Sequence, residues 1–536
     1  MDLTKVLSRA MARDRADRYP SAAAFLRDLE DLVQGRVVTT LPKIVAVMDF
    51  DNMSGDEELG WIASATAESI RLELAGIPAL EVMSREKVVR ARQALKAAGM
   101  PASASDLGLR LGCGWVVSGV VERTDGALRV TMLLTEAATS RLTTTERVDG
   151  TVEGLVAIQE QLARGAMNAL GVTPLTTSTK HARSLEAEKS FSRARVLLDQ
   201  LSKGSVEQAL ELLERAISTD PEYAPALAGL AWAYAFRSIA TTDPADLDSA
   251  IRFAERAISV DPRSSEAHMW RGYVLLRRDQ YDQAAAACQL ATELATTNAT
   301  APYFAGSAFL FGGRSSDALP YLQRSLDLDG KVGMGWLALG AAHLSLQQLL
   351  EAHYSFSRAR DLEGDPVRFP TAGAAAYIAE VLRIQGHLDG ARGHALEGVE
   401  AAERSDHAYR DFFRAHALSV LGRTALDQDD VSAARAAFRQ VLAQAQGRPR
   451  TRSCGHLVVQ ALARLARADS HPELLTEALR LFDTRETYNF EPFFGALDEQ
   501  TLFELAAAAH AMGQLGIARV LLTRAHRAGS RGTLES

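Results

Sequence analysis

Residues 334–359 read MGWLALGAAHLSLQQLLEAHYSFSRA, and the same spacing of small and apolar residues occurs twice before this stretch. Three columns of residues recur with a step of 34 positions. The columns are Gly272, Gly306 and Gly340; Ala284, Ala318 and Ala352; and Cys288, Leu322 and Phe356. A fixed period near 34, with a small residue early and an alanine later, is typical of a helix–turn–helix repeat.

One pair of antiparallel helices cannot bury its apolar faces alone, so such pairs must stack into a solenoid. Small residues are needed where two helix backbones approach closely. The copy quoted above resembles the tetratricopeptide repeat at Trp336, Leu339, Gly340, Ala352, Phe356 and Ala359. This resemblance implies roughly nine copies over residues 185–530, forming an all-α superhelix with a concave groove that binds a protein or peptide partner.

The first helix of each copy lines the groove in proteins of that family. Transferred copy by copy, the resemblance gives these groove positions as partner-binding residues: Trp232, Met269, Tyr273, Arg277, Tyr303 and Leu337. Aromatic and methionine side chains on an accessible concave face are common anchors for peptides. The alternative is that each of them packs against neighbouring helices, because large apolar side chains are more often buried than functional.

Residues 40–172 predict a small α+β domain, separated from the repeats by a linker over 173–184. Strands are expected at 42–50, 80–83, 115–121, 128–134 and 140–148, and helices at 59–74, 84–98, 105–112 and 151–170. Asp125-Gly126 between two β-rich runs predicts a hairpin. The domain resembles the TolB amino-terminal-like domain, most specifically at residues 50–56 (FDNMSGD). This resemblance implies a non-enzymatic domain fused to signalling outputs.

A cluster of carboxylates follows the first expected strand. Its members are Asp49, Asp51, Asp56, Glu57 and Glu58. Oxygen ligands of this kind suit hard cations, but the spacing of a calcium-binding loop is missing. The favoured interpretation is structural, with Asp51 and Asn52 as turn formers and Asp56 at the start of the next helix. We therefore expect no metal and no cofactor.

Residues 1–36 predict two short amphipathic helices. The segment 1–36 resembles the C-terminal end of a bacterial serine/threonine protein kinase domain, with matches at Ala10, Asp14, Arg18, Tyr19, Ser21, Ala22 and Leu29. In that family every catalytic motif precedes this segment. Lookalikes further on, at 49–51, 112–114 and 407–411, lack the required context. No catalytic residue is therefore predicted, and the chain is not expected to be an enzyme.

The composition limits the function classes. A chain of 536 residues is too long for one compact core, so several units are expected. A net charge of −8 argues against a bulk nucleic-acid binder. The three cysteines form no CxxC pair, and neither a signal peptide nor an apolar run long enough to cross a membrane is evident. A cytoplasmic location without membrane contact is expected.

Three functions are compatible with this sequence. The first is a non-catalytic bacterial regulatory scaffold in signal transduction, which holds a protein partner in the groove of its repeats. The second is the regulatory C-terminal portion of a serine/threonine kinase whose catalytic core is missing from this chain. The third is a self-associating structural array.

Overall fold

The computed structural model describes Phe25 and residues 43–56, 59–77, 79–97, 99–100, 102–124, 127–172, 184–198, 203–241, 243–363, 371–405, 410–446, 455–484 and 497–530. The chain divides into two compact units, each considered by itself. Unit 1 comprises Met1–Trp270 with Glu293–Asn298, and unit 2 comprises Arg271–Thr292 with Ala299–Ser536. The predictions for residues 1–36, apart from Phe25, and for the linker at 173–183 fall outside the described residues.

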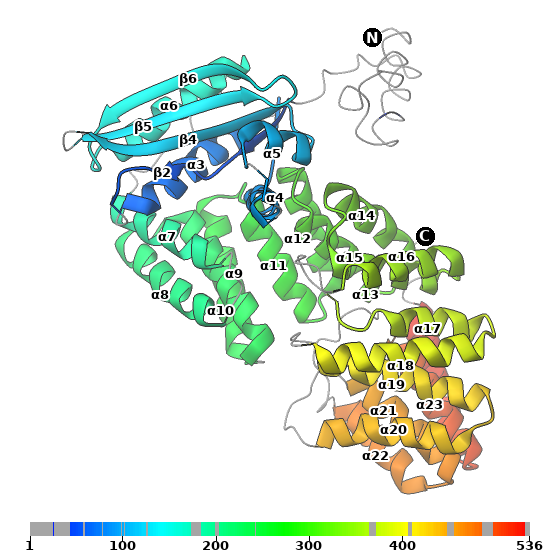
Figure 1. Cartoon of the computed structure of the whole chain (residues 1–536). Helices are drawn as coiled ribbons and strands as arrows, with labels where there is room; N and C mark the ends of the chain where they lie inside the picture. The colour runs from blue at the N-terminus through cyan, green and yellow to red at the C-terminus, as the bar shows by residue number, and fades with distance from the viewer. Residues whose placement is uncertain are drawn as a thin grey trace, which may run out of the picture. The chain divides into compact units, whose positions relative to one another are not determined.

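A six-stranded mixed sheet forms the centre of the α+β domain in unit 1 (Figure 1). Its strands are β1 (Lys43–Val47), β2 (Asp51–Asn52), β3 (Leu80–Val82), β4 (Trp115–Thr124), β5 (Ala127–Glu136) and β6 (Arg141–Gly150). The order is β3-β1-β4-β5-β6, with β2 beside β4. β1 pairs in parallel with β3 and β4, whereas β4, β5 and β6 form an antiparallel meander. Thr124 pairs with Ala127, which confirms the predicted hairpin.

Helices cover both faces of the sheet near β1. α3 (Gly60–Ala75) and α6 (Leu155–Leu170) share one core with the strands, and α4 (Arg85–Ala97) and α5 (Ala104–Leu111) share a second core on the opposite face. β1 serves both cores, because Val45 and Val47 point to the first and Ala46 points to the second. Alternate side chains of a strand point to opposite faces, so a strand covered on both sides must be apolar throughout.

The first repeat packs directly against the α+β domain. α7 (Leu185–Leu198) lies on α3, and Leu185 joins the core of the domain. Nε2 of Gln159 on α6 donates to Oε1 of Glu188 on α7 at 2.8 Å, where both side chains are buried. The hydroxyl of Thr297 donates to the carbonyl of Val82 on the edge strand β3. The domain therefore covers the end of the solenoid, as a terminal repeat requires.

Eighteen helices of the described residues follow the α+β domain as consecutive pairs, the arrangement expected of an all-α superhelix. The first four are α7, α8 (Lys203–Thr219), α9 (Ala224–Thr241) and α10 (Pro244–Val260). The next six are α11 (Ser265–Arg277), α12 (Tyr281–Leu294), α13 (Thr300–Phe311), α14 (Ser315–Leu328), α15 (Gly333–Ser345) and α16 (Leu349–Asp361). The last eight are α17 (Ala375–Ile384), α18 (Leu388–Arg404), α19 (Arg410–Asp427), α20 (Val431–Gln446), α21 (Gly455–Asp469), α22 (Pro472–Thr484), α23 (Leu497–Ala511) and α24 (Leu515–Ser530).

The glycine column exists because the two helices of a repeat touch there. A Cβ atom on Gly340 would lie 2.5 Å from Cδ1 of Phe356, and one on Gly306 would lie 2.6 Å from Cγ of Leu322. Neither distance leaves room for a methyl group. The glycine of the first helix thus packs directly against the large residue sixteen positions later in the second helix. This contact explains why the two columns recur with the same step of 34 residues.

In the described part of the chain, every helix is too short or too polar to span a bilayer.

Candidate protein-binding surfaces

Within each unit, several first helices of neighbouring repeats lie next to one another. α7 lies beside α9, α13 beside α15, and α17, α19, α21 and α23 follow in series. Their side chains therefore form rows that run from repeat to repeat. Because a partner that spans several repeats would meet these rows, they are the surfaces to compare with the predicted groove residues.

One row in unit 1 is an aromatic and charged stack. The guanidinium carbon of Arg195 on α7 lies 5.0 Å from the ring centroid of Trp232 on α9. The ring of Trp232 stacks on that of Trp270 on α11, with centroids 5.7 Å apart and an interplanar angle of 10°. Nη1 of Arg195 also donates to Oε1 of Glu266 on α11 at 2.7 Å. These four residues are called the Trp232 stack below.

The Trp232 stack is apolar inside and charged at its edge. Trp232 and Trp270 are buried, whereas the side chains of Arg195 and Glu266 keep 16% and 29% of their surface exposed. Met269, another predicted groove residue, is buried and contacts Nδ2 of Asn298 through its sulfur. A ligand at this surface would therefore meet the ion pair first, while the indole rings hold the guanidinium in place.

The predicted groove residues of unit 2 are mostly interior. Tyr273, Tyr303 and Leu337 are all buried. Nη1 of Arg277, which is partly exposed, donates to the hydroxyl of Tyr273 at 2.9 Å. Phe304 lies between the rings of Tyr273 and Tyr303, with centroids at 5.1 and 5.3 Å. Partner binding by these residues stays a prediction, and Arg277 offers the accessible polar group of the cluster.

The burial of these anchors follows from the sequence of the helices that carry them. All twelve residues of α13 are buried, and its sequence TAPYFAGSAFLF contains no charged residue. α15 is similar, with nine of its thirteen residues buried. A helix that is apolar all round is packed on all sides. The apolar character of α13 and α15 favours packing over binding for Tyr303 and Leu337. The transfer of groove positions from the family did not take it into account.

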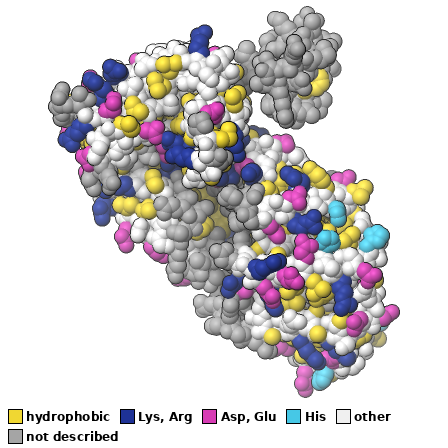
Figure 2. Space-filling view, in the orientation of Figure 1, with side chains coloured by type: hydrophobic (Ala, Val, Ile, Leu, Met, Phe, Trp, Pro, Cys, Tyr) yellow, Lys and Arg dark blue, Asp and Glu magenta, His cyan; other side chains and the backbone are white. Residues whose placement is uncertain are grey.

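A row of buried charges joins the first helices of the last four repeats. Oε1 of Glu380 on α17 accepts from Nη1 of Arg423 on α19 at 2.8 Å and from Nη2 of Arg383 at 3.1 Å. Nη2 of Arg464 on α21 donates to Oε1 of Glu504 on α23 at 2.8 Å. These five residues are called the ion row below. Figure 2 shows further basic and acidic side chains interspersed over these repeats on the face in view.

The ion row was missed because the groove positions were transferred only as far as Leu337. Glu380 and Arg423 each directly follow the small residue of the first helix, Ala379 and Gly422. Both repeats keep the spacing of the glycine column, since a Cβ on Gly422 would lie 2.5 Å from Cε1 of Phe438. The sequence therefore carries an acidic and a basic residue at equivalent positions of neighbouring repeats, and this pattern could have predicted the ion pair.

Burial and charge perturb the pKa values of this region strongly. Burial alone would raise the pKa of Glu380, but the guanidinium groups of Arg423 and Arg383 outweigh it and lower the pKa to about 2. Burial, followed by the charge of Arg423, lowers the pKa of His416 to about 3, although Glu380 opposes this shift. His416 stacks on Tyr377 with centroids 4.3 Å apart. The imidazole is therefore neutral in the folded protein at neutral pH.

Acid should weaken the C-terminal repeats through His416. Its pKa is lower in the folded chain than the ordinary 6.5, so the unfolded chain takes up the proton first as the pH falls from 6.5 towards 3. Stability is full above this window and falls within it by about 1.4 kcal/mol per pH unit. His416→Phe, which keeps the ring stack, should lose this dependence between pH 6.5 and 4.5, whereas the dependence below pH 4.5 should persist because the pKa of Glu380 is also lowered. Hydrogen exchange of α19 in both proteins at each pH measures the difference.

His387, an exposed histidine before α18, supplies the matched control. His387→Phe should keep the acid sensitivity of the wild type. An identical pH dependence of α19 in the wild type and in His416→Phe would contradict the assignment.

The carboxylates after β1 are engaged in ion pairs. Nη2 of Arg85 donates to Oδ2 of Asp49 at 2.7 Å, and Nη2 of Arg92 donates to Oδ1 of Asp51 at 2.6 Å. Asp56 lies 3.3 Å from a guanidinium nitrogen of Arg123. Glu57 and Glu58 fall outside the described residues. Within the described ranges, no three His, Cys, Asp or Glu side chains gather where they could hold a metal ion.

Both described cysteines are unsuited to nucleophilic chemistry. Burial raises the pKa of the Cys113 thiol to about 11 and also raises that of Cys288. Thiols of this kind stay protonated at neutral pH and act as small apolar side chains.

Comparison with known protein families agrees with the paired helices. Residues 245–299 match the family described as the tetratricopeptide repeat. This stretch of the chain is a tetratricopeptide repeat. The matched residues cover α10, α11 and α12, so they include Glu266 and Trp270 of the Trp232 stack.

One curated protein is similar to part of this chain. A protein of Rhizobium meliloti (strain 1021) named "Putative adenylate cyclase 3" is 29% identical over 192 residues. The match covers 35% of this chain and 32% of the relative, so the chain spans about a third of the length of that protein.

Solved structures with similar helix arrays include RapI in its apo form and YrrB. The RapI structure has a TM-score of 0.44 and 13% identity, and the alignment covers 63% of this chain and 97% of RapI. The YrrB structure, described as a TPR protein with an unusual peptide-binding site, has a TM-score of 0.28 and 20% identity. That alignment covers 38% of this chain and 96% of YrrB. These likenesses concern the fold alone.

Proposed function

We propose that this chain is a non-catalytic regulatory scaffold that binds a protein or peptide partner through the first helices of its repeats. The observation that carries the proposal is the Trp232 stack, because it places a fixed ion pair of partly exposed side chains at the edge of an aromatic row. Protein recognition commonly combines a rigid aromatic interior with charges at the rim. A cytoplasmic location and the absence of catalysis belong to the same proposal.

The partner segment should carry both a hydrogen-bond donor and an acceptor. Arg195 offers nitrogen donors and Glu266 offers carboxylate oxygens, and their bond of 2.7 Å fixes both groups before binding. A fixed pair loses less side-chain entropy on binding than two free side chains do. An extended peptide presents donors and acceptors along its backbone, which makes it the chemistry that fits this edge best.

The α+β domain is proposed to be a TolB amino-terminal-like domain whose role is structural and regulatory. Support comes from the loop after β2, which carries the most specific part of the resemblance. Nδ2 of Asn52 donates to the carbonyl of Asp56 at 2.9 Å, and Oδ1 of Asn52 accepts from the backbone nitrogen of Ser54 at 3.1 Å. The asparagine and serine of the FDNMSGD run thus hold the loop closed.

Replacing Arg195 with alanine should weaken partner binding about tenfold, because the ion pair at the accessible edge is lost. The partner is first captured with the full chain from the bacterium that carries the gene and is then purified. Isothermal titration of wild type and variant with the purified partner measures the change in Kd. Arg215→Ala on the second helix α8 is the matched control, since Arg215 is exposed in the same unit.

A charge swap separates recognition from folding. The double variant Arg195→Glu with Glu266→Arg keeps an ion pair within the chain but exchanges the two charges that a partner meets. If the double variant still fails to bind the partner, the result supports direct recognition of Arg195 and Glu266 by the partner. Full binding by the Arg195→Ala variant would refute this surface as the docking site.

A second candidate is that the chain is the regulatory C-terminal portion of a longer signalling enzyme, such as a bacterial serine/threonine kinase, whose last helices residues 1–36 resemble. The observation that favours this class is the similarity to the Rhizobium meliloti protein named as an adenylate cyclase. Sequencing the DNA upstream of the Met1 codon tests it. An in-frame kinase or cyclase core would establish the second candidate, and an in-frame stop codon would exclude it.

A further inference from the structure

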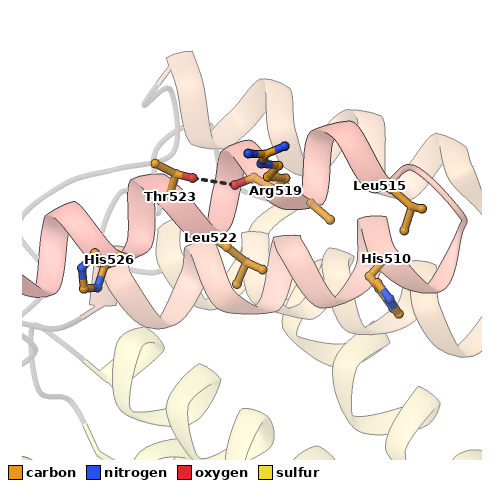
Figure 3. Close-up of a pocket in the computed structure, with 7 residues that line it drawn as sticks. His510, Leu515, Arg519, Leu522, Thr523 and His526 are labelled. Carbon is orange, nitrogen blue, oxygen red and sulfur yellow. Dashed lines mark hydrogen bonds between the residues drawn. The ribbon is translucent and has the colours of Figure 1, made fainter.

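A shallow depression at the last helix pair is lined by residues of α24, among them Leu515, Leu522 and His526, and by His510 of α23 (Figure 3). Nothing in the described part of the chain shows what covers this surface, so no partner is assigned to it. The contacts of the α+β domain with the repeats, in contrast, lead from the sheet to the Trp232 stack.

The α+β domain holds α7, the helix that carries Arg195. Nε2 of Gln159 on α6 donates to Oε1 of Glu188 on α7 at 2.8 Å, and both side chains are buried. Leu185, at the start of α7, packs against the core of the domain. Glu188 precedes Arg195 by seven positions, so both residues lie on the same face of α7. The position of Arg195 is therefore tied to the α+β domain.

A second contact runs through the turn between α12 and α13. Thr297, which is buried in this turn, donates its hydroxyl to the carbonyl of Val82 on the edge strand β3. The next residue, Asn298, contacts the sulfur of Met269 on α11 through Nδ2 at 3.7 Å. Residues 293–298 belong to unit 1 together with the α+β domain. The turn therefore ties α11 to the sheet.

These two contacts come together at the ion pair of the Trp232 stack. Nη1 of Arg195 on α7 donates to Oε1 of Glu266 on α11 at 2.7 Å, and side chains of both helices contact the ring of Trp232. The sheet, α6, α7, α11 and the turn thus form a closed ring of contacts. In such a ring, the spacing of α7 and α11 depends on how the α+β domain holds each of them.

We propose that the α+β domain regulates the Trp232 stack, because its contacts through Gln159 and Thr297 set the spacing at which Arg195 and Glu266 pair. This inference rests on the proposed function, in which the partner meets this ion pair. A pair fixed before binding loses less entropy than a loosened pair does, so a domain that holds both helices favours binding. Thr297 is thus a positioning residue, which acts on the partner through the ion pair.

Thr297→Val tests the proposal, because it removes the hydrogen bond to Val82 and keeps the shape of the side chain. It should change the near-ultraviolet circular dichroism of the stacked indole rings, taken as the difference between each chain and its Trp270→Phe counterpart, and this readout needs no partner. In the titration with the purified partner it should raise Kd about fivefold, the low end of couplings between sites. In the Arg195→Ala background it should have no further effect on Kd, because the ion pair is already lost.

Two further variants control for a general loss of stability. Thr297→Ser keeps the hydroxyl and should behave as the wild type does. Thr424→Val in unit 2 is the matched control, since Thr424 is also buried and donates its hydroxyl to the carbonyl of Val420 at 2.9 Å. It should change neither the circular dichroism of the stack nor Kd.

An unchanged circular dichroism signal or an unchanged Kd in Thr297→Val would overturn the proposal. So would equal effects of Thr297→Val and Thr424→Val, or an undiminished effect of Thr297→Val in the Arg195→Ala background. These results leave the proposed function standing as long as Arg195→Ala weakens binding. Full binding by Arg195→Ala would instead refute the docking site, and the circular dichroism comparison would still decide whether the domain sets the geometry of the stack.

Discussion

Replacing Glu380 with glutamine is expected to destabilise the C-terminal repeats by about 3 kcal/mol, because removing one partner from a buried ion network leaves the other charges uncompensated. Oε1 of Glu380 serves both Arg423 and Arg383, and the side chains of Glu380 and Arg423 are exposed by only 11% and 12%. Glutamine has nearly the same shape, so the change isolates the charge. Hydrogen exchange of α17 and α19 should accelerate about a hundredfold.

Asp427→Asn is the matched control for this prediction. Oδ2 of Asp427 accepts from Nη1 of Arg383 at 2.6 Å, but the Asp427 side chain is 41% exposed. Pairs of this kind contribute at most about 1 kcal/mol. Equal effects of Glu380→Gln and Asp427→Asn would show that the ion row does not hold the repeats together.

Gly340→Ala is expected to destabilise unit 2 by about 1–3 kcal/mol, because the added methyl group overlaps a packed ring. Its carbon would lie 2.5 Å from Cδ1 of Phe356, which is itself fully buried and cannot move aside. Alanine has the higher helix propensity, so any loss of stability must come from this contact. Urea unfolding followed by circular dichroism measures the change.

Gly393→Ala, in the same array, is expected to have the opposite effect on stability from Gly340→Ala. Gly393 lies in the interior of α18, and a Cβ there would have no atom within 4 Å. This substitution should therefore stabilise by about 0.5–1 kcal/mol through helix propensity. If Gly340→Ala also stabilised the protein, the close packing of the two helices at the glycine column would be wrong.

The repeat architecture was predictable because periodic contacts leave periodic residues. Gly340 contacts Phe356, sixteen positions later. The equivalent glycines, Gly272 and Gly306, make the same contact in the two preceding copies, so all three copies keep the same spacing. The strands of the α+β domain were predictable for a related reason, since β1 is apolar on both faces and is covered on both faces. Local pattern and tertiary packing agree in these elements.

The candidate surfaces were predictable only in part. Trp232 and Met269 were predicted by transfer from the family, and both are buried, whereas the exposed edge of the Trp232 stack belongs to Arg195 and Glu266. Nothing in the local sequence distinguishes these two from other charged residues, because their pairing joins helices 71 positions apart. The depth of a side chain depends on the winding of the whole solenoid, which single-repeat patterns do not encode.

The most direct test of the scaffold function is hydrogen exchange of the full chain with and without its captured partner. The proposal predicts that protection on binding is concentrated in the first helices α7, α9 and α11, which carry the Trp232 stack. Protection confined to the second helices α8 and α10, or to the sheet β1–β6, would contradict it.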